Sequence, residues 1–486
     1  MEAGESMVED KKRVVIVGGG IAGLTSAFYL QKMILDYHLP IEIQLIESSH
    51  RLGGKLQTVR RDGFTIERGP DSFLAEKSSL IRLAKEVGMD DQLVQNPIGK
   101  LFVIVNDTLH AMPGGSIMGI PTEIGPFITT GLFSIPGKLR AAADFILPKS
   151  ERGKDQSLGQ FFRRRLGDEV VENLIEPLLS EIYAGDIDQL SLMATFPQFY
   201  EVEQKYRSLI LGMKRATPAQ SKQKDIKDNK KGGFLTFKTG LQSFVEAIEA
   251  KLDPQCILKG HRVDKIMKLT DDYEVFLNNG ESVKANAIIA ATPHQITQLM
   301  FADYRMFDLF KTFPSVSVAT IAIAFPQEAI KNDINGTGFV VSRNSDYSIT
   351  AGTWTHKKWE HTVPEGKVLL RCYIGRSGDE TIVDLSDDQI INIVLDDLKK
   401  TMTITRNPDF SIVSRWKDSM PQYTVGHKLR LATIKEQLKK ELPGVFLAGA
   451  SYGGVGVPDC IDQGEEAVRN VLDFLKSNPV NPEAVQ

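Results

Sequence analysis

The chain has 486 residues and a formal net charge of −4, from 58 basic and 62 acidic side chains. This near balance argues against a nucleic-acid partner, which favours a basic excess. The length predicts two or three domains, and 42% hydrophobic with 25% charged residues is ordinary for a globular protein. Cys256, Cys372 and Cys460 lie far apart and support neither a disulfide framework nor a thiolate metal site, as expected in a reducing cytosol.

Residues 1–13 are polar and acidic, which is the wrong chemistry for a signal peptide. Uncharged apolar runs stay short of the ~20 residues that a membrane-spanning helix needs. We therefore expect a cytoplasmic protein that is soluble, or at most peripheral to the inner face of the cell membrane.

The segment KRVVIVGGGIAGLTSAFYL carries the strongest signal. It predicts a buried strand over 14–17, a glycine turn and a helix from about Ile21. The glycines of its G-x-G-x-x-G pattern are Gly18, Gly20 and Gly23. In a strand–turn–helix unit they permit, in that order, a tight turn, the approach of a pyrophosphate, and close packing of helix on strand. The helix N-terminus then offers N–H groups to the phosphates.

A second predicted strand, over 41–46, ends at Glu47, 24 residues beyond Gly23. A carboxylate at this place can accept hydrogen bonds from ribose hydroxyls and would repel a 2′-phosphate. Strand, turn, helix, second strand and acid together predict a dinucleotide-binding unit rather than an ordinary glycine turn.

The segments after Glu47 extend this unit. SSHRLGG places Arg51, Gly53 and Gly54 in a loop where one cation and exposed backbone could follow the cofactor's phosphates, with a plain surface turn as the alternative. GFTIERGPDSF predicts a strand and a turn, and Asp71 or Ser72 is expected to cap the helix that SSLIRLAKEVGM suggests.

Residues 97–150 are rich in Pro, Gly and apolar residues, and apolar residues at helical spacing follow. We interpret this region as a helical insertion with its own core, with a membrane-touching or substrate-gating surface as the alternative. The run Arg163–Arg165 is interpreted as a solvated helix face, with a phosphate site as the alternative. Residues 214–231 are lysine-rich and without periodicity, which predicts a mobile basic loop.

Order returns with FLTFKTGLQSFVEAIEAKL, read as a turn and a helix, followed by short strands around an Asn279-Gly280 hairpin turn. AIIAATP predicts a buried strand that Pro293 stops. Between 305 and 435, alternating strands and a helix with Ser386 as its N-cap predict an antiparallel sheet with helices on one face.

The C-terminal unit repeats the chemistry of the first. A strand over 445–448 leads into a turn with several glycines, and a helix is expected to start near Asp459 or Cys460. Glycines let backbone lie flat against a planar ligand, and the helix N-terminus supplies a positive field. That field would stabilise the negative N1/C2-carbonyl edge of a reduced isoalloxazine ring, whereas a reduced nicotinamide gains no such anion. The unit therefore favours a flavin over NAD, with a plain C-terminal helix as the alternative.

These motifs together resemble a known family. GGGIAG, E-x-x-x-R-x-GG, ERGPDSF, the valine of HRV, AATP and GAS…GVGVPDCIDQG resemble the flavin amine oxidase and protoporphyrinogen oxidase superfamily. Within it, FFRRRLGDEVVENLIEPLLSEIYAGDIDQLSL and SMPQYTVGHKLR are similar to the porphyrinogen oxidases of heme biosynthesis, most closely to those of Bacillus-type bacteria. The similarity runs nearly end to end.

The resemblance implies an oxidoreductase with non-covalently bound FAD and molecular oxygen as the electron acceptor. For the Gram-positive branch it implies oxidation of coproporphyrinogen III to coproporphyrin III, with protoporphyrinogen IX as the alternative main substrate. It also leaves open a weak peripheral membrane contact and the hand-over of product to a ferrochelatase-type enzyme.

The implied fold class is α/β plus α+β, with a discontinuous Rossmann-like FAD-binding domain, an α+β substrate domain and a helical insertion. The expected boundaries are 1–90, 232–304 and 436–486 for the FAD-binding domain, 91–213 for the helical, membrane-associated-type insertion, 214–231 for the mobile loop and 305–435 for the substrate-binding domain.

The resemblance also assigns cofactor contacts residue by residue. The ADP half is assigned to Gly18, Gly20, Gly23, Glu47, Arg51, Gly53 and Gly54, and the adenine to the backbone of Val263. The flavin end is assigned to Gly449, Ser451, Val455, Gly456 and Val457, with Trp416 near the ring system. Further cofactor contacts are expected at Ile21, Ala22, Ser48, Lys55, Gly69, Pro70, Asp71 and Ser72.

The expected substrate pocket is apolar and aromatic, with a few cations for propionates. Its candidates are Lys77, Phe339, Trp354, Arg371 and Tyr373, and core packing is the alternative for the aromatic residues. Close relatives carry a basic pair after GPDSFL, whereas this chain reads AEK there, so Lys77 alone remains.

Aromatising a porphyrinogen removes six electrons and six protons, so three hydride transfers and three reoxidations by oxygen would yield three hydrogen peroxide. Each pyrrole N–H can lose a proton once hydride leaves, and we therefore assign no catalytic side-chain base. The histidines His294, His356, His361 and His427 are scattered and expected at the surface or in loops, and the sequence shows no metal-binding pattern.

Two other classes of protein stay open. An amine oxidase or carotenoid-type desaturase would share the fold, but the terminal YGGVGVPDC offers only Tyr452 as an aromatic frame for an amine. A non-catalytic binder that kept the fold would have no use for the intact glycines of the flavin end.

Overall fold

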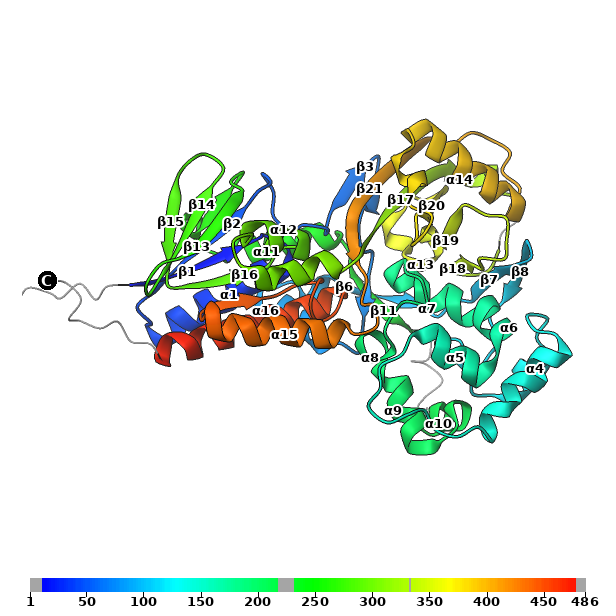
Figure 1. The fold of residues 1–486 in the computed structure, drawn as a ribbon. Helices are drawn as coiled ribbons and strands as arrows, with labels where there is room; N and C mark the ends of the chain where they lie inside the picture. The colour runs from blue at the N-terminus through cyan, green and yellow to red at the C-terminus, as the bar shows by residue number, and fades with distance from the viewer. Residues whose placement is uncertain (1–10, 217–230, 332–333, 478–486) are drawn as a thin grey trace, which may run out of the picture.

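The computed structural model describes residues 11–216, 231–331 and 334–477. Figure 1 shows two lobes: a parallel sheet with its helices at the left, and a larger mixed sheet at the right above a group of helices. We call the left lobe the parallel-sheet lobe. The two parts of the right lobe are called the mixed sheet and the helical region.

The parallel sheet has the strand order β12-β2-β1-β16-β22, and each neighbouring pair runs parallel. Its strands are β1 (Lys12–Val17), β2 (Ile41–Glu47), β12 (Ile257–Lys259), β16 (Ala287–Ala290) and β22 (Val445–Leu447). Counted by their order in the chain, the strands lie 3-2-1-4-5, so the sheet is doubly wound and its direction switches between β1 and β16. This confirms the predicted Rossmann-like fold and places the ligand edge after these two strands.

Side chains alternate along β1, so each face of the sheet has its own core. Val14 and Ile16 pack with the helices α1 (Ile21–Tyr37), α2 (Ser78–Glu86), α11 (Leu241–Glu249) and α16 (Val457–Ser477). Val15 and Val17 pack with β13 (Val263–Lys268), β14 (Tyr273–Leu277), β15 (Ser282–Ala285), α12 (His294–Met300), η5 (Arg305–Thr312) and α15 (His427–Glu441). The four β1 side chains are 0–4% exposed, as a parallel sheet covered on both faces requires.

Helices α1 and α16, from distant parts of the chain, cross at Gly464. A Cβ at Gly464 would lie 2.6 Å from the carbonyl oxygen of Ala22, which is close enough to require glycine. The hydroxyl of Ser26 donates to the carbonyl of Gly464 at 3.2 Å. The two strand–glycine–helix units predicted from sequence therefore lie side by side.

The mixed sheet has the strand order β21-β17-β20-β19-β18-β7-β8. Its strands are β7 (Leu101–Val105), β8 (Thr108–Ala111), β17 (Ser315–Pro326), β18 (Gly338–Val341), β19 (Ile349–Trp354), β20 (Lys367–Ile374) and β21 (Phe410–Pro421). Strand β19 was not predicted, and β7 and β8 come from the stretch assigned to the helical insertion. Because β7 runs parallel to β18, the sheet is mixed rather than purely antiparallel.

Helix α14 (Asp387–Thr401) covers one face of the mixed sheet through a buried stripe that includes Ile390, Val394 and Leu398. Its predicted N-cap is confirmed, because the Ser386 side chain accepts a hydrogen bond from the backbone N–H of Gln389. The Gln389 side chain in turn accepts one from the backbone N–H of Ser386.

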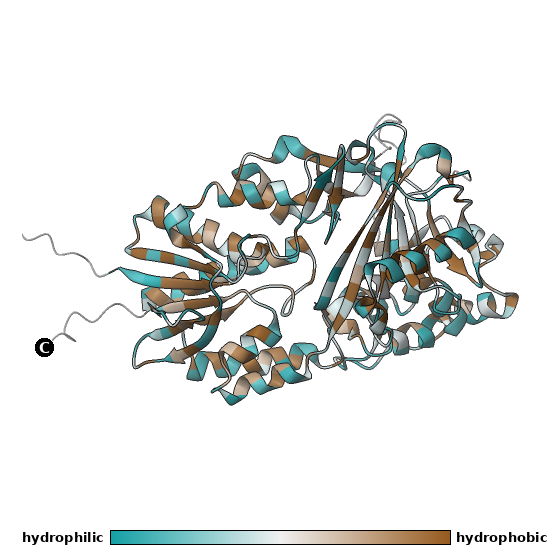
Figure 2. Cartoon of the chain, turned by 90° about the horizontal axis from the view of Figure 1, so that it is seen from above, coloured by the Kyte–Doolittle hydropathy of each residue, from teal (hydrophilic) through white to brown (hydrophobic). Residues whose placement is uncertain are grey.

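The helical region is built around its own aromatic core, which includes Phe161, Phe162 and Phe199. Its helices are α3 (Ile124–Thr129), α4 (Ile135–Ala142), α5 (Leu158–Leu166), α6 (Asp168–Val170), α7 (Glu176–Tyr183), α8 (Leu192–Thr195), α9 (Pro197–Tyr206) and α10 (Leu209–Ala216). Figure 2 shows hydrophobic residues concentrated in the strands of both sheets, whereas the outer helices carry hydrophilic and hydrophobic residues in turn.

Short strands lie between the lobes. Strand β11 (Lys231–Phe237) pairs with β5 (Phe73–Leu74) and β6 (Leu93–Pro97), and β3 (Thr58–Arg61) pairs with β4 (Phe64–Glu67). The predicted hairpin turn joins β14 to β15, with Gly280 at φ +87°.

Several predicted boundaries are wrong. Helix α16 begins at Val457, before the expected Asp459, and the N-cap of α2 is Lys77 rather than Asp71 or Ser72. Helix α15 packs on the parallel-sheet lobe although most of its length was assigned to 305–435. The predicted basic loop lies outside the described residues except at its two ends.

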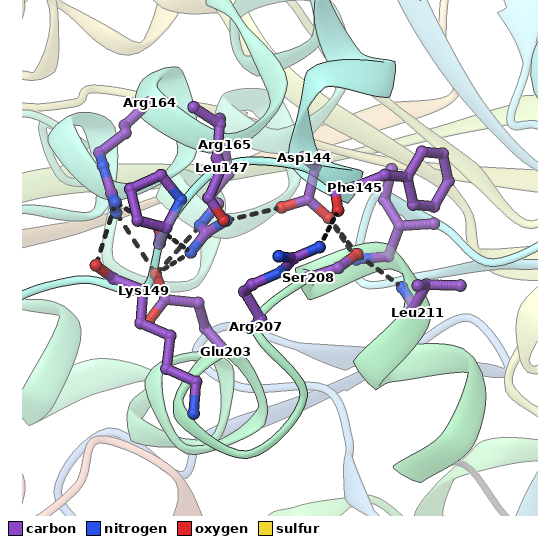
Figure 3. A network of polar contacts seen from close by, with 12 residues as sticks. Asp144, Phe145, Leu147, Lys149, Arg164, Arg165, Glu203, Arg207, Ser208 and Leu211 are labelled. Carbon is purple, nitrogen blue, oxygen red and sulfur yellow. Dashed lines mark hydrogen bonds and ion pairs between the residues drawn. The ribbon is translucent and has the colours of Figure 1, made fainter.

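The Arg163–Arg165 run is not simply a solvated face, because Arg165 is fully buried and pairs with carboxylates of other elements (Figure 3). Its guanidinium Nε lies 3.0 Å from Glu203 Oε1, and its Nη1 lies 3.3 Å from Asp144. Burial works to raise the pKa of Glu203, but Arg165 and Ser150 outweigh it and hold that pKa below its ordinary value. No local pattern predicts this pairing, since the partners of Arg165 lie 21 and 38 residues away in the chain.

Candidate functional site

The first glycine turn has the geometry that its pattern predicts. Gly18, at φ +103°, lies against β16, where a Cβ would be 2.7 Å from the carbonyl oxygen of Ala291. A Cβ on Gly23 would overlap the carbonyl oxygen of Gly18, so helix and turn pack in contact. A Cβ on Gly20 would meet no protein atom within 4 Å. The turn is therefore tight where the fold needs it and open where a phosphate would approach.

The N-terminus of α1 adds to this anion-binding character. Gly20 is the N-cap, no side chain caps the helix within the described chain, and its first turn carries no acidic residue. Main-chain N–H groups and the positive end of the helix dipole therefore face the open side of the turn.

Glu47 ends β2 beside this turn, as predicted. Its carboxylate accepts hydrogen bonds from the backbone N–H groups of Gly19 at 2.7 Å and Ser49 at 2.8 Å. The backbone N–H of His261 donates to the carbonyl of Glu47 at 3.1 Å, which brings the HRV segment and Val263 close to it. The Ser48 hydroxyl donates to the same carboxylate at 3.1 Å.

The RLGG loop lies against the first glycine turn. The N–H of Gly53 donates to the carbonyl of Gly19 at 2.7 Å, and Gly20 and Gly53 form a parallel bridge. The Arg51 guanidinium donates to the carbonyls of Leu52 at 2.8 Å and Leu56 at 3.2 Å, so it holds the shape of its own loop.

The C-terminal glycine turn meets the same site from the other side. Gly449, at φ +122°, would place a Cβ 3.9 Å from the Cβ of Ala22, which is in the first turn of α1. Ser451 and Val457 are buried, and Val455 packs against the core of the helical region. Gly456 directly precedes α16, so the helix N-terminus opens towards this turn.

The GPDS segment is anchored from the mixed sheet by charge. Asp71 accepts from the Lys358 ammonium at 3.0 Å and the Trp359 indole N–H at 3.3 Å, and Arg371 Nη1 lies 3.9 Å away. Burial raises the pKa of Asp71, but Lys358 and Arg371 together outweigh it and hold that pKa well below its usual range. Arg371 also donates to the carbonyl of Gly69.

Lys55 and Trp416 complete the junction between the lobes. The Trp416 indole N–H donates to the carbonyl of Arg68 at 3.0 Å, and a Cβ on Gly69 would lie 3.5 Å from its ring. The Lys55 ammonium donates to the carbonyl of Ser419, and burial lowers its pKa. Three of the predicted cofactor contacts, Lys55, Gly69 and Trp416, thus gather where β21 meets the parallel-sheet lobe.

The predicted substrate residues separate into three groups. Phe339 and Trp354 are 3% and 4% exposed and pack against each other in the core of the mixed sheet, so for these two the core alternative is the correct one. The Arg371 guanidinium donates to the Tyr373 hydroxyl at 3.0 Å and lies 3.9 Å from the Asp71 carboxylate. Lys77 forms an ion pair with Asp459 of α16 at 2.5 Å, so its charge already has a partner.

The expectation that the histidines are superficial is wrong for two of them. His294 and His427 are 0% and 2% exposed and begin helices α12 and α15 directly beside the C-terminal glycine turn. Burial lowers the pKa of both, to about 4 for His427. His427 lies in the quoted SMPQYTVGHKLR and His294 directly follows the quoted AATP, but neither sequence reveals that the histidine is buried.

Within the described residues, no helix combines the length and apolar character needed to cross a membrane.

Comparison with known proteins identifies the class. The sequence profile of the flavin-containing amine oxidoreductases matches residues 21–472, so the chain belongs to that family and is a flavin oxidoreductase. Solved structures with the same fold include reduced UDP-galactopyranose mutase, at a TM-score of 0.70 and 15% identity, covering 96% of both chains.

More similar proteins narrow the group. The chain is 55% identical to the coproporphyrinogen III oxidase of Bacillus subtilis (strain 168), over 97% of this chain and 100% of that protein. It is 44% identical to the enzyme of the same name from Staphylococcus aureus, over 96% and 100%. An Exiguobacterium structure assigned by name as a protoporphyrinogen oxidase superposes with a TM-score of 0.86 at 38% identity, over 96% and 100%.

Proposed function

We propose that this protein oxidises coproporphyrinogen III to coproporphyrin III, using non-covalently bound FAD and molecular oxygen. The observation that carries the proposal is the meeting of two glycine turns at Ala22, one open at Gly20 and one directed at the N-terminus of α16. The similarity to named coproporphyrinogen III oxidases supports the choice of substrate.

The residues present fit FAD. Gly20 and the N-terminus of α1 would hold the pyrophosphate, Glu47 the adenosine ribose, and Gly449 to Val457 the ring. When bound, FAD supplies the two-electron acceptance that porphyrinogen oxidation needs. The distance along the chain between the two turns explains why neither alone identifies the cofactor.

The protein's own contribution is binding and orientation. Oxidation of the macrocycle removes six electrons and six protons, which balances the reduction of three O₂ to three H₂O₂. Asp71 is neutralised by its ion pairs, and the hydrogen bonds of His294 already engage Ser451 and Phe313. Neither residue therefore serves as a base, and the pyrrole N–H groups lose their protons to solvent.

The test is a side-by-side assay on purified protein. We expect a yellow protein that forms fluorescent coproporphyrin faster than protoporphyrin, with three H₂O₂ per porphyrin. A colourless protein that takes up no FAD would overturn the cofactor assignment. Faster turnover of protoporphyrinogen IX would instead select the alternative substrate.

We also propose a weak peripheral membrane contact through the helical region. Ile135 and Leu139, one turn apart on α4, are 74% and 70% exposed, and Ile124, Ile128 and Ile146 nearby are also exposed. Co-sedimentation with anionic lipid vesicles tests it, and I135S/L139S should reduce the bound fraction. Equal recovery of both proteins in the supernatant would reject the contact.

A further inference from the structure

The segment between β21 and α15 belongs to SMPQYTVGHKLR, a motif without an assigned role. Its backbone is tied to the helical region. Ser191 N–H donates to the carbonyl of Tyr423 at 2.7 Å, and Val425 N–H donates to the carbonyl of Gln189 at 3.0 Å. These backbone hydrogen bonds hold the segment in place, and its side chains extend from there to the C-terminal glycine turn.

The Tyr423 hydroxyl closes the C-terminal glycine turn. It donates to the carbonyl of Ala450 at 2.6 Å and accepts from the N–H of Gly454 at 2.8 Å. Tyr423 is 2% exposed, so water does not replace these two bonds. The Tyr423 hydroxyl therefore links Ala450 to Gly454 across the turn, and Gly454 lies three residues before α16 begins.

Two buried histidines hold the residues between these points. The Ser451 hydroxyl contacts both the backbone N and the Nδ1 of His294 at 3.1 Å. His427 Nε2 lies 3.3 Å from the carbonyl of Tyr452, and its ring stacks on Tyr423 at 4.2 Å with 18° between planes. The turn is therefore held by side chains of other elements along most of its length.

We propose that Tyr423 is a positioning residue, whose hydroxyl holds the 450–454 turn in the shape that receives the flavin ring and aligns the N-terminus of α16 with it. The inference rests on the proposed FAD site. The ring of Tyr423 packs against Tyr183 and His427, and this packing survives in phenylalanine. Removing the hydroxyl alone leaves a buried carbonyl and a buried N–H without partners.

The experiment compares Tyr423→Phe with Tyr347→Phe. Tyr347 is a suitable control because it is also buried, in the core of the mixed sheet, and its hydroxyl has no hydrogen-bond partner within the described chain. Tyr423→Phe should weaken FAD binding about tenfold or more in titration of the apoprotein. It should also shift the flavin absorption band and make the flavin midpoint potential more negative, while Tyr347→Phe changes none of these.

A second variant, His427→Phe, keeps a ring beside Tyr423 and removes only the donor to Tyr452. It should loosen FAD in the same direction, and it decides the question if Tyr423→Phe does not fold. Unchanged FAD affinity, spectrum and potential in whichever variant folds would overturn the positioning role. Failure of the wild-type protein to bind FAD would instead overturn the proposed cofactor, so the two failures are distinguishable.

Discussion

Gly20 and Gly23 belong to one motif, but Gly20 leaves room for a ligand whereas Gly23 allows close packing within the protein. The side chain of an alanine at Gly20 would point into space that no protein atom occupies within 4 Å. Gly20 also has φ −68°, which any residue can adopt. Gly20→Ala should therefore fold normally and lose FAD affinity, because its methyl group lies where the pyrophosphate would approach.

Gly23→Ala is the matched comparison, since its methyl group would overlap the carbonyl oxygen of Gly18. It should lower the melting temperature of the apoprotein by about 1–3 °C, the shift that an overpacking cost of about 1–3 kcal/mol produces in a chain of this length. Thermal melts and FAD titrations of both variants separate the two demands. Equal loss of apoprotein stability in both would contradict this division of roles.

His427 gives the apoprotein a dependence on acid. The folded protein lowers the pKa of His427 to about 4, while an unfolded chain has a value of about 6.5. The unfolded state therefore binds the proton first, and stability falls as the pH drops from about 6.5 towards about 4. Urea unfolding at pH 7 and pH 5 should show this loss, and it should be smaller in His427→Asn.

His294, Arg430 and Asp155 face the same histidine, and His294 shares the direction of its pKa shift. The comparison is therefore between the wild type and His427→Asn at each pH, not between single curves. Equal losses of unfolding free energy in both proteins would show that groups other than His427 cause the acid sensitivity.

At the scale of elements, the N-terminus of α16 carries a paired charge. Asp459 lies in the first turn of the helix and pairs with Lys77 at 2.5 Å. Lys77→Ala leaves this carboxylate uncompensated near the proposed flavin ring, which opposes formation of a reduced anion. We expect a more negative flavin potential with the KM for coproporphyrinogen unchanged.

Arg82→Ala is the control, because Arg82 pairs with Glu465 farther along the same helix. It should leave the potential unchanged. A raised KM with an unaltered potential in Lys77→Ala would show instead that Lys77 grips a propionate, as the sequence suggested.

The elements that the sequence predicted well are those whose signals are local. The strand before Gly18, the strand ending at Glu47 and the capping box at Ser386 depend on residues a few positions apart. Strand β19 was not predicted because its ITAGTW sequence has no clear alternation of polar and apolar residues. Strand β7 was not predicted because its pairing with β18 is remote in sequence.

The predictions for the site also depended on whether the signal was local in sequence. The glycines and Glu47 were proposed as cofactor contacts because dinucleotide binding restricts residue type at fixed spacing. Phe339 was misassigned because an aromatic residue in a strand has the same pattern in a core and in a pocket. Tyr423 was quoted without a role, since its bonds to Ala450 and Gly454 join segments 27 and 31 residues away.

At the scale of the whole molecule, the helical region depends on a buried ion pair. Arg165 and Glu203 are both fully buried and join α5 to α9, with Asp144 as a second partner (Figure 3). Glu203→Gln would leave the guanidinium short of one charge and should destabilise the protein by about 3 kcal/mol. Chemical denaturation measures this, and the exposed Glu201→Gln on the same helix should change little.

The position of α16 in the chain also constrains biosynthesis. The parallel sheet gains its β22 edge, and α1 gains its neighbour at Gly464, only after residues 445–477 have left the ribosome. Until then the first glycine turn lacks the helix that packs beside it, and closing contacts over more than 400 residues is slow. A growing polypeptide stalled before β22 should therefore hold no flavin.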